Sequence, residues 1–240
     1  MALTDNLVSY WKLDEASGNA ADSVGSNTLT NRNTTAYAAG KINNGADLEA
    51  TSDNGFSITD ASQSGLDFSD ALTFAGWIKL ESAPASYYSM IGKRVGTGNQ
   101  RSYLFYGLNG NLVFDNSSTG SDGSSVSVTA TTNTATWYHV AVTKTGTTVK
   151  FYLNGSQQGA TQTATLSSIY NSTAPFELGW WSDNADADLD GFMDEWGVWS
   201  RVLSDAEITE LYNSGAGLSY PFTTATSGKN FPTLTLLGVG

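Results

Sequence analysis

The chain contains no cysteine, only four prolines and a single histidine among its 240 residues. The absence of cysteine excludes disulfides, thiolate metal sites and cysteine nucleophiles. No apolar run approaches the ~18 residues that a membrane-spanning helix needs, so membrane insertion is not expected. The first residues, MALTDNLVSYWKL, lack a basic segment followed by an apolar stretch, which predicts no signal peptide. A chain from which a signal had been removed would read the same.

Basic residues are also scarce, with 11 Lys and Arg against 23 Asp and Glu, which gives a net charge of -12. Nucleic acids and anionic membranes are bound through clustered Lys and Arg, so the composition argues against both as partners. It fits a cation, a basic partner, or a neutral polar ligand such as a sugar. Surface acids that only keep a protein soluble would give the same balance.

The chain is rich in Ser, Thr, Asn and Gly, with 25 glycines, and its apolar residues alternate with polar ones in short runs. Such runs every ~8–12 residues, separated by turn residues, indicate a β-sandwich or barrel. Asn109-Gly110 and Asn154-Gly155 supply the positive φ angles of tight hairpins. The predicted strands are 7–13, 41–48, 55–58, 72–80, 90–93, 102–108, 112–115, 124–130, 137–144, 149–153, 176–179 and 192–199.

One helix is predicted near the C-terminus. Ser204 to Glu207 reads S-x-x-E, the pattern of a capping box. Ile208, Leu211 and Tyr212 then form an apolar stripe at helical spacing, and Gly215 is a plausible end. We expect residues 1–217 to form one domain and 218–240 to be a C-terminal extension or linker.

Six segments in order resemble the laminin-G-like subgroup of concanavalin A-like lectin/glucanase domains found in bacteria and phages. They are LVSYWKLDEASGNAADSVGS, GADLE, LTFAGWIKL, TWYHVAVTKTGTTVKFYLNGSQQG, APFELGWWSD and DGFMDEWGVWSRVLSDAEITELYNSG, and together they cover roughly residues 6 to 215. The resemblance implies an all-β fold, an antiparallel two-sheet β-sandwich jelly roll with one short C-terminal helix. It also implies a non-enzymatic binding or adhesion role, often with one calcium ion.

Two metal sites are candidates. Asp186, Asp188 and Asp190 followed by Gly191 open like an EF-hand loop, but the twelfth position is Gly197 and the flanks are strand-like. This excludes an EF-hand and leaves a calcium loop or a solvated acidic turn. The resemblance implies a second Ca²⁺ site where the N-terminal segment meets the last long strand, with ligands from Asp22, Asp194 and the vicinity of Asn27.

The residues around Asp194 offer two interpretations. By strand alternation, Asp194 should share the face of Phe192 and Trp196, where a buried carboxylate would need a charge partner such as a cation. The alternative is an exposed carboxylate on the polar face.

Several aromatic and polar residues fall in predicted loops or strand ends, where they could line a shallow sugar site. Aromatic rings present flat apolar faces to sugars, and polar side chains fix orientation. Core packing is the alternative and accounts for most of the 7 tryptophans. The candidates are Trp180, Trp181, Asp183, Tyr87, Tyr88, Asn99 and Arg101.

Catalysis is not expected. Glucanases of the resembled fold carry E-x-D-x-E on one strand, whereas Asp194 and Glu195 are adjacent and should face opposite ways. His139 faces the same way as Trp137 and Ala141, which favours a structural histidine over a base.

The sequence therefore predicts a non-catalytic, calcium-containing recognition or adhesion module, with a glycan or cell-surface polysaccharide as the expected ligand. The predicted location is extracellular, on a cell surface or on a phage virion. Two alternatives stay open. One is a structural protein, such as a virion fibre, tail or surface decoration, with other virion or surface proteins as partners. The other is a glycoside hydrolase or lyase of the same fold.

Overall fold

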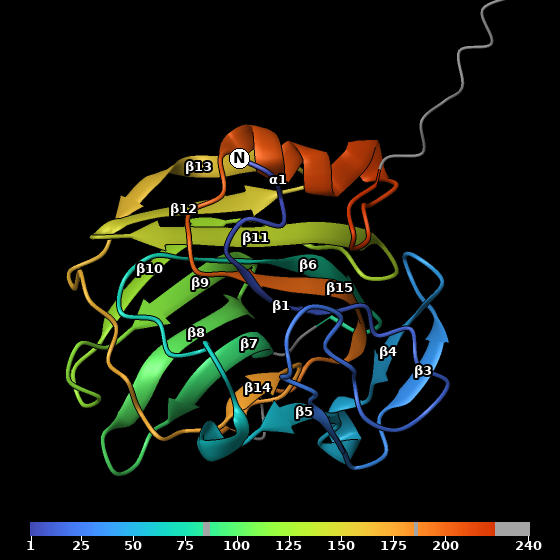
Figure 1. The fold of residues 1–240 in the computed structure, drawn as a ribbon, viewed down its shortest axis with the longest axis horizontal. Coiled ribbons are helices and arrows are strands. Elements are labelled where there is room, and N and C mark those ends of the chain that lie inside the picture. The colour runs from blue at the N-terminus through green and yellow to red at the C-terminus, as the bar shows by residue number, and fades with distance from the viewer. Residues whose placement is uncertain (84–86, 185–186, 224–240) are drawn as a thin grey trace, which may run out of the picture.

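The computed structural model describes residues 1–83, 87–184 and 187–223, and it consists of two antiparallel sheets packed face to face (Figure 1). Along the first sheet the strands are β13 (Ser156–Thr163), β12 (Thr148–Leu153), β11 (Trp137–Thr145), β6 (Leu72–Leu80), β15 (Gly191–Trp199), β4 (Asn44–Leu48) and β3 (Ala36–Ala39), and β1 (Leu7–Trp11) also pairs with β15. Along the second they are β10 (Ser124–Thr129), β9 (Asn111–Asn116), β8 (Gln100–Leu108), β7 (Tyr87–Val95), β14 (Phe176–Leu178), β5 (Gly55–Ile58) and β2 (Thr30–Arg32). The predicted two-sheet sandwich is confirmed.

The core lies between the two sheets because each strand sends alternate side chains inward. On β6, Leu72, Phe74, Ile78 and Leu80 all enter the core, as the alternation predicts. Trp77 lies on the opposite face, where its ring is 5.3 Å from that of His139. Burial lowers the pKa of His139 to about 3, so this histidine is neutral and packed, as expected.

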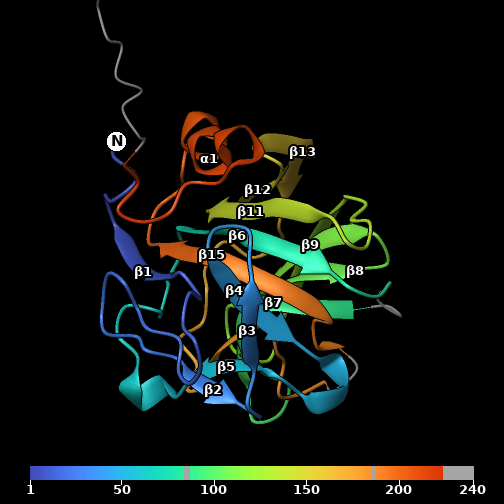
Figure 2. The same cartoon turned by 90° about the vertical axis from the view of Figure 1, so that its right-hand side faces the viewer.

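Helix α1 (Asp205–Tyr212) lies beside β12 and β13 on the outer side of the first sheet (Figures 1 and 2). The predicted capping box is present: Glu207 N donates to Ser204 Oγ and Ser204 N donates to Glu207 Oε2. Short 3₁₀ turns occupy Ala50–Ser52, Asp60–Ser62 and Asn213–Gly215. No helix among the described residues is long and apolar enough to cross a membrane.

Three strands, β2, β3 and β13, were not predicted. Each lies at an end of its sheet, and none contains a residue buried from solvent. An edge strand that is open to water has no need of apolar alternation, so its sequence carries no such signal.

A bulge in β15 changes the predicted orientation of its acids. The register shifts between Asp194 and Gly197, and Glu195 has a φ of 53°. Asp194 lies opposite Trp77 on the outer face, whereas Trp196 enters the core. The expectation that Asp194 shares the face of Trp196 was therefore wrong. The expectation that Asp194 and Glu195 face opposite ways also fails, because Glu195 lies beside Trp77 and His139 on that same side.

The described C-terminal residues continue the packing of the domain beyond position 217. Leu218 belongs to the apolar cluster beneath α1, and the ring of Phe222 is 5.3 Å from that of Tyr10. Residues 224–240, most of the predicted extension, lie outside the described part.

Candidate functional site

The outer face of the second sheet carries a row of aromatic side chains. Leu104 and Tyr106 on β8 and Val113 on β9 point away from the core, because their neighbours Tyr103, Phe105 and Phe114 fill it. The ring of Tyr87 stacks on that of Tyr106 at 5.9 Å, and the ring of Trp181 lies 6.4 Å from Tyr106 on the same cluster. We call Tyr87, Tyr106 and Trp181 the aromatic row.

An ion pair lies at one end of the aromatic row. The guanidinium of Arg94 lies 5.3 Å from the centre of the Trp181 ring, and its Nη1 is 2.7 Å from Oδ2 of Asp115. The hydroxyl of Tyr106 also donates to the Asp115 carboxylate, at 3.4 Å to Oδ2. Apolar ring faces thus adjoin charged groups that can bind sugar hydroxyls.

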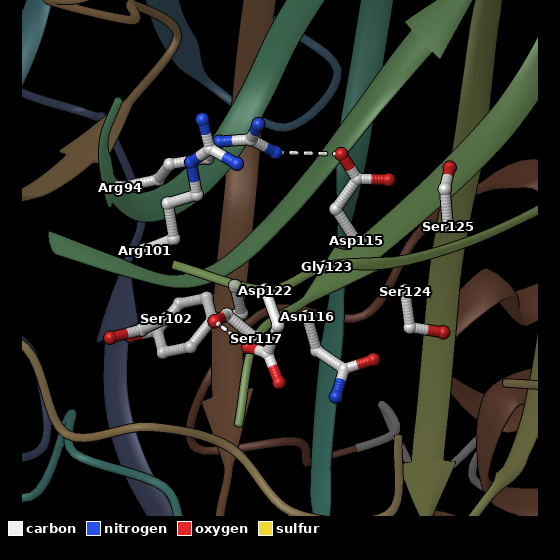
Figure 3. A pocket seen from close by; sticks show the side chains of 11 residues that line it. Arg94, Arg101, Ser102, Asp115, Asn116, Ser117, Asp122, Gly123, Ser124 and Ser125 are labelled. Carbon is white, nitrogen blue, oxygen red and sulfur yellow. Dashed lines mark hydrogen bonds and ion pairs between the residues drawn. The ribbon is translucent and has the colours of Figure 1, made fainter. Parts of the chain in front are cut away.

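A second arginine, Arg101, lies beside Arg94. Arg94 and Arg101 are directly opposite each other in the pairing of β7 with β8, and Figure 3 shows their two guanidinium groups side by side, facing Asp115. Both line a pocket of about 110 Å³ that is partly open to solvent, which is smaller than the ~300–1,000 Å³ typical of pockets that enclose a whole ligand. Its other lining residues include Asp115, Asn116, Asp122, Ser124 and Ser125.

Asp122 closes the other side of the pocket but has its acceptors occupied. It accepts hydrogen bonds from the hydroxyls of Ser117 and Ser118 and from the backbone N–H of Ser118 and Thr119. These bonds, that from Ser117 foremost, hold the pKa of the Asp122 carboxyl well below its usual value. Asp122 therefore stays ionised and shapes the pocket wall.

The segment that carries Trp181 is fixed to the sheet by two buried acids. Glu177 Oε2 accepts from Ser182 N at 3.2 Å, and Asp188 Oδ1 accepts from Trp181 N at 3.3 Å. Their other oxygens, Glu177 Oε1 and Asp188 Oδ2, have no partner among the described residues. Burial raises the pKa of each carboxyl to about 7. The two acids thus position Trp181 from behind.

The structure gathers part of the predicted sugar site. Trp181, Tyr87 and Arg101 lie on this face. The turn between β7 and β8 holds Asn99, and Asp183 Oδ2 accepts from Gly96 N of the same turn at 2.6 Å.

Two predicted residues lie elsewhere. Tyr88 is buried in the core, and its hydroxyl lies 3.1 Å from Thr132 Oγ1. Trp180 is 8% exposed and is covered by the Arg32 guanidinium 3.6 Å above its ring. Sequence reasoning missed Arg94, Tyr106 and Asp115, although strand alternation within β8 and β9 would have placed Tyr106 and Asp115 outward.

The calcium set implied by the resemblance fits only in part. Asp22 already accepts hydrogen bonds from the backbone N–H groups of Tyr10, Val24 and Asn27. The Asn27 side chain is likewise engaged, with Oδ1 accepting from Ser64 N. The side chains of these two residues hold the N-terminal segment in place through hydrogen bonds to backbone N–H groups.

Asp194 is different. Its Oδ2 accepts from the backbone N–H groups of Lys41 and Ile42, but its Oδ1 is buried without a partner. Burial raises the pKa of this carboxyl to about 9. Asp194 therefore has the free oxygen that a cation would need, and it shares no hydrogen-bond partner with Asp22 or Asn27.

The acidic loop of the sequence does not converge on one point in its described part. Asp186 lies outside the described residues. Asp188 faces Trp181 N, whereas Asp190 accepts from Ser82 Oγ. Among the described residues, three carboxylates that approach within 4.8 Å of one another occur elsewhere, at Asp47, Glu49 and Glu81.

The sequence and fold are similar to those of known proteins. A family model described as the concanavalin A-like lectin/glucanases superfamily matches residues 49–209. No curated protein matches the chain. Many solved structures do, at sequence identities that show a shared fold.

Three of these structures are similar over most of this chain. Domain 4 of AbnA, an extracellular arabinanase from Geobacillus stearothermophilus, was solved with arabinotriose; it is 22% identical, with a TM-score of 0.64 over 85% of this chain and 97% of that one. The binding domain of Paraclostridial Mosquitocidal Protein 1 is 16% identical, with a TM-score of 0.69 over 88% and 52%. The ligand-binding domain of botulinum neurotoxin serotype D, solved with N-acetylneuraminic acid, is 16% identical, with a TM-score of 0.65 over 87% and 51%. The chain spans about half the length of the two toxin domains.

Proposed function

This chain belongs to the concanavalin A-like lectin/glucanase superfamily, and we propose that it is a carbohydrate-binding module that holds a glycan against the aromatic row. The observation that carries the proposal is the juxtaposition of Trp181 and Tyr106 with the Arg94–Asp115 ion pair. Sugar rings present C–H groups to aromatic faces and hydroxyls to charged groups, so a site for them needs both. AbnA domain 4 and the serotype D domain support the proposal, because these two proteins of similar fold were solved in complex with arabinotriose and N-acetylneuraminic acid.

We propose that the module recognises the glycan without cleaving it. Hydrolysis of a glycosidic bond needs one carboxyl that donates a proton and a second that acts as base or nucleophile. Near the aromatic row, Asp115 is paired with Arg94 and Asp122 is held ionised by its hydrogen bonds. Glu177 and Asp188 have pKa values suited to proton transfer, but they are 2% and 5% exposed. A substrate in the pocket would therefore meet no acid and base pair among these four carboxyls of the described residues. A protein that binds such a glycan would act outside the cell, on a cell surface or on a phage virion.

We also propose that calcium binds at Asp194, as a feature separate from the aromatic row. The support is its buried Oδ1 without a partner. Burial disfavours the ionised form of this carboxyl, and the positive charge of a bound cation would stabilise it. Asp22 and Asn27 would then serve the fold through their hydrogen bonds.

Binding to a panel of neutral and acidic polysaccharides, measured by affinity electrophoresis and calorimetry, tests the glycan proposal. Trp181→Ala should weaken binding about ten-fold or more, the order of one lost aromatic stacking contact. Trp137→Ala is the matched control, because Trp137 is a half-buried tryptophan on the other sheet. Absence of binding to every polysaccharide, or equal losses in both variants, would contradict the proposal.

A further inference from the structure

The pocket beside the aromatic row concentrates positive charge in a strongly acidic protein. Arg94 and Arg101 are two of only four arginines in a chain of net charge -12. They are direct cross-strand partners, and like charges in that position destabilise a sheet. A sheet that holds such a pair needs negative charge nearby to offset it.

The described residues supply that negative charge for one arginine only. Asp115 pairs with Arg94. Asp122, the other acid that lines the pocket, has both oxygens occupied by hydroxyl and backbone donors of its own turn. The Arg101 side chain makes no hydrogen bond or ion pair within the described part of the chain, and Arg94 Nε is buried without an acceptor.

The free donors lie beside the surface on which a sugar would stack. The Arg94 guanidinium is 5.3 Å from the Trp181 ring, and Arg101 is adjacent to it in the pocket (Figure 3). An acidic group carried by a sugar on Trp181 would therefore lie within reach of both arginines. The planar fork of a guanidinium matches a carboxylate through two parallel hydrogen bonds.

We propose that this site selects glycans that bear a carboxylate, such as uronic or sialic acid polymers, over neutral glycans, with Arg101 as the residue that determines the preference. The inference rests on the proposed function, since it names the class of sugar that the aromatic row would hold. A free small anion lacks the stacking surface and is repelled by the net charge of the protein, so it should bind weakly.

The test compares polygalacturonate, alginate and polysialic acid with a carboxyl-reduced form of each, using the intact chain. The native polymer should bind about ten-fold tighter than its reduced form for at least one pair, the order expected for a charge-assisted contact. Arg101→Gln should abolish this preference, and Arg101→Lys should restore only part of it. Lys150→Gln is the control, because it removes the same charge from β12 on the first sheet.

The outcomes separate the two proposals. Equal binding of native and reduced polymers, or loss of the preference in Lys150→Gln as well, would overturn the carboxylate inference and leave glycan binding standing. Tight binding of dextran sulfate alone would also overturn it, because the anion would then be a sulfate ester. Absence of binding to any polymer would overturn the proposed function itself. Melting temperatures close to that of the unmodified protein would show that the variants remain folded.

Discussion

Arg94 on β7 and Asp115 on β9 form an ion pair across the intervening strand β8, with 2.7 Å between Nη1 and Oδ2. Both side chains are less than one-fifth exposed. Asp115 also accepts a hydrogen bond from the Tyr106 hydroxyl, and the Arg94 guanidinium lies 5.3 Å from the centre of the Trp181 ring. It therefore couples the stability of the sheet to the shape of the proposed sugar site.

Removal of the Asp115 charge should destabilise the protein. In Asp115→Asn, Arg94 keeps its charge beside Arg101 with no counter-ion, so we expect the free energy of unfolding to fall by about 1–3 kcal/mol. Urea denaturation measures this loss. Glu210→Gln is the control, because it removes the charge of an exposed acid on α1. Equal stability of Asp115→Asn and the unmodified protein would show that the ion pair contributes nothing.

The buried Glu177 should make stability depend on pH. Burial raises its folded pKa to about 7, above the ~4.3 of a free glutamate, with Arg32 opposing and Asp188 adding to the shift. Between these values the folded protein binds more protons than the unfolded chain, so this group's contribution to stability is present at about pH 4 and is lost as pH rises to about 7. We expect Glu177→Gln to reduce the fall in melting temperature across that range.

The control for Glu177 is Glu210→Gln, which alters an exposed glutamate on α1. Melting curves at half-unit pH intervals compare the two variants with the unmodified protein. A pH profile of Glu177→Gln that matches that of Glu210→Gln would mean that the Glu177 carboxyl ionises as freely in the fold as in the unfolded chain.

Calcium should raise the melting temperature, because a ligand that binds only the folded state stabilises it. Asp194→Ala should abolish the rise. Asp22→Ala should lower the melting temperature whether or not calcium is present, since it removes the acceptor of three backbone N–H groups. Scanning calorimetry with calcium or chelator, together with elemental analysis, measures both effects. An unchanged melt and the absence of bound metal would eliminate the calcium proposal.

The helix cap offers a test of local stability. Ser204→Ala removes the hydroxyl that accepts from Glu207 N and should cost about 1 kcal/mol in unfolding free energy. Ser127→Ala on β10 is the control, since Ser127 is exposed on an edge strand. Equal unfolding free energies for the two variants would contradict the assigned role of the cap.

Local pattern in the sequence determined the fold class, most of the strands and helix α1. Alternation fixed the core faces of β6, and the capping box fixed the start of α1, because both depend on neighbours along the chain. Leu218 and Phe222 pack on the domain, although no local pattern after Gly217 indicated this contact. Polar edge strands β2, β3 and β13 carried no such local signal.

Only the tertiary structure decided the site. Arg94, Asp115 and Trp181 come from three separate segments, and their approach depends on the order of strands in the sheet. The bulge at Glu195 likewise reversed the predicted relation of Asp194 to Trp196, because one extra residue exchanges the faces of all that follow. Periodicity along a chain specifies which side of a strand a residue occupies, whereas pairing between distant strands specifies what it meets there.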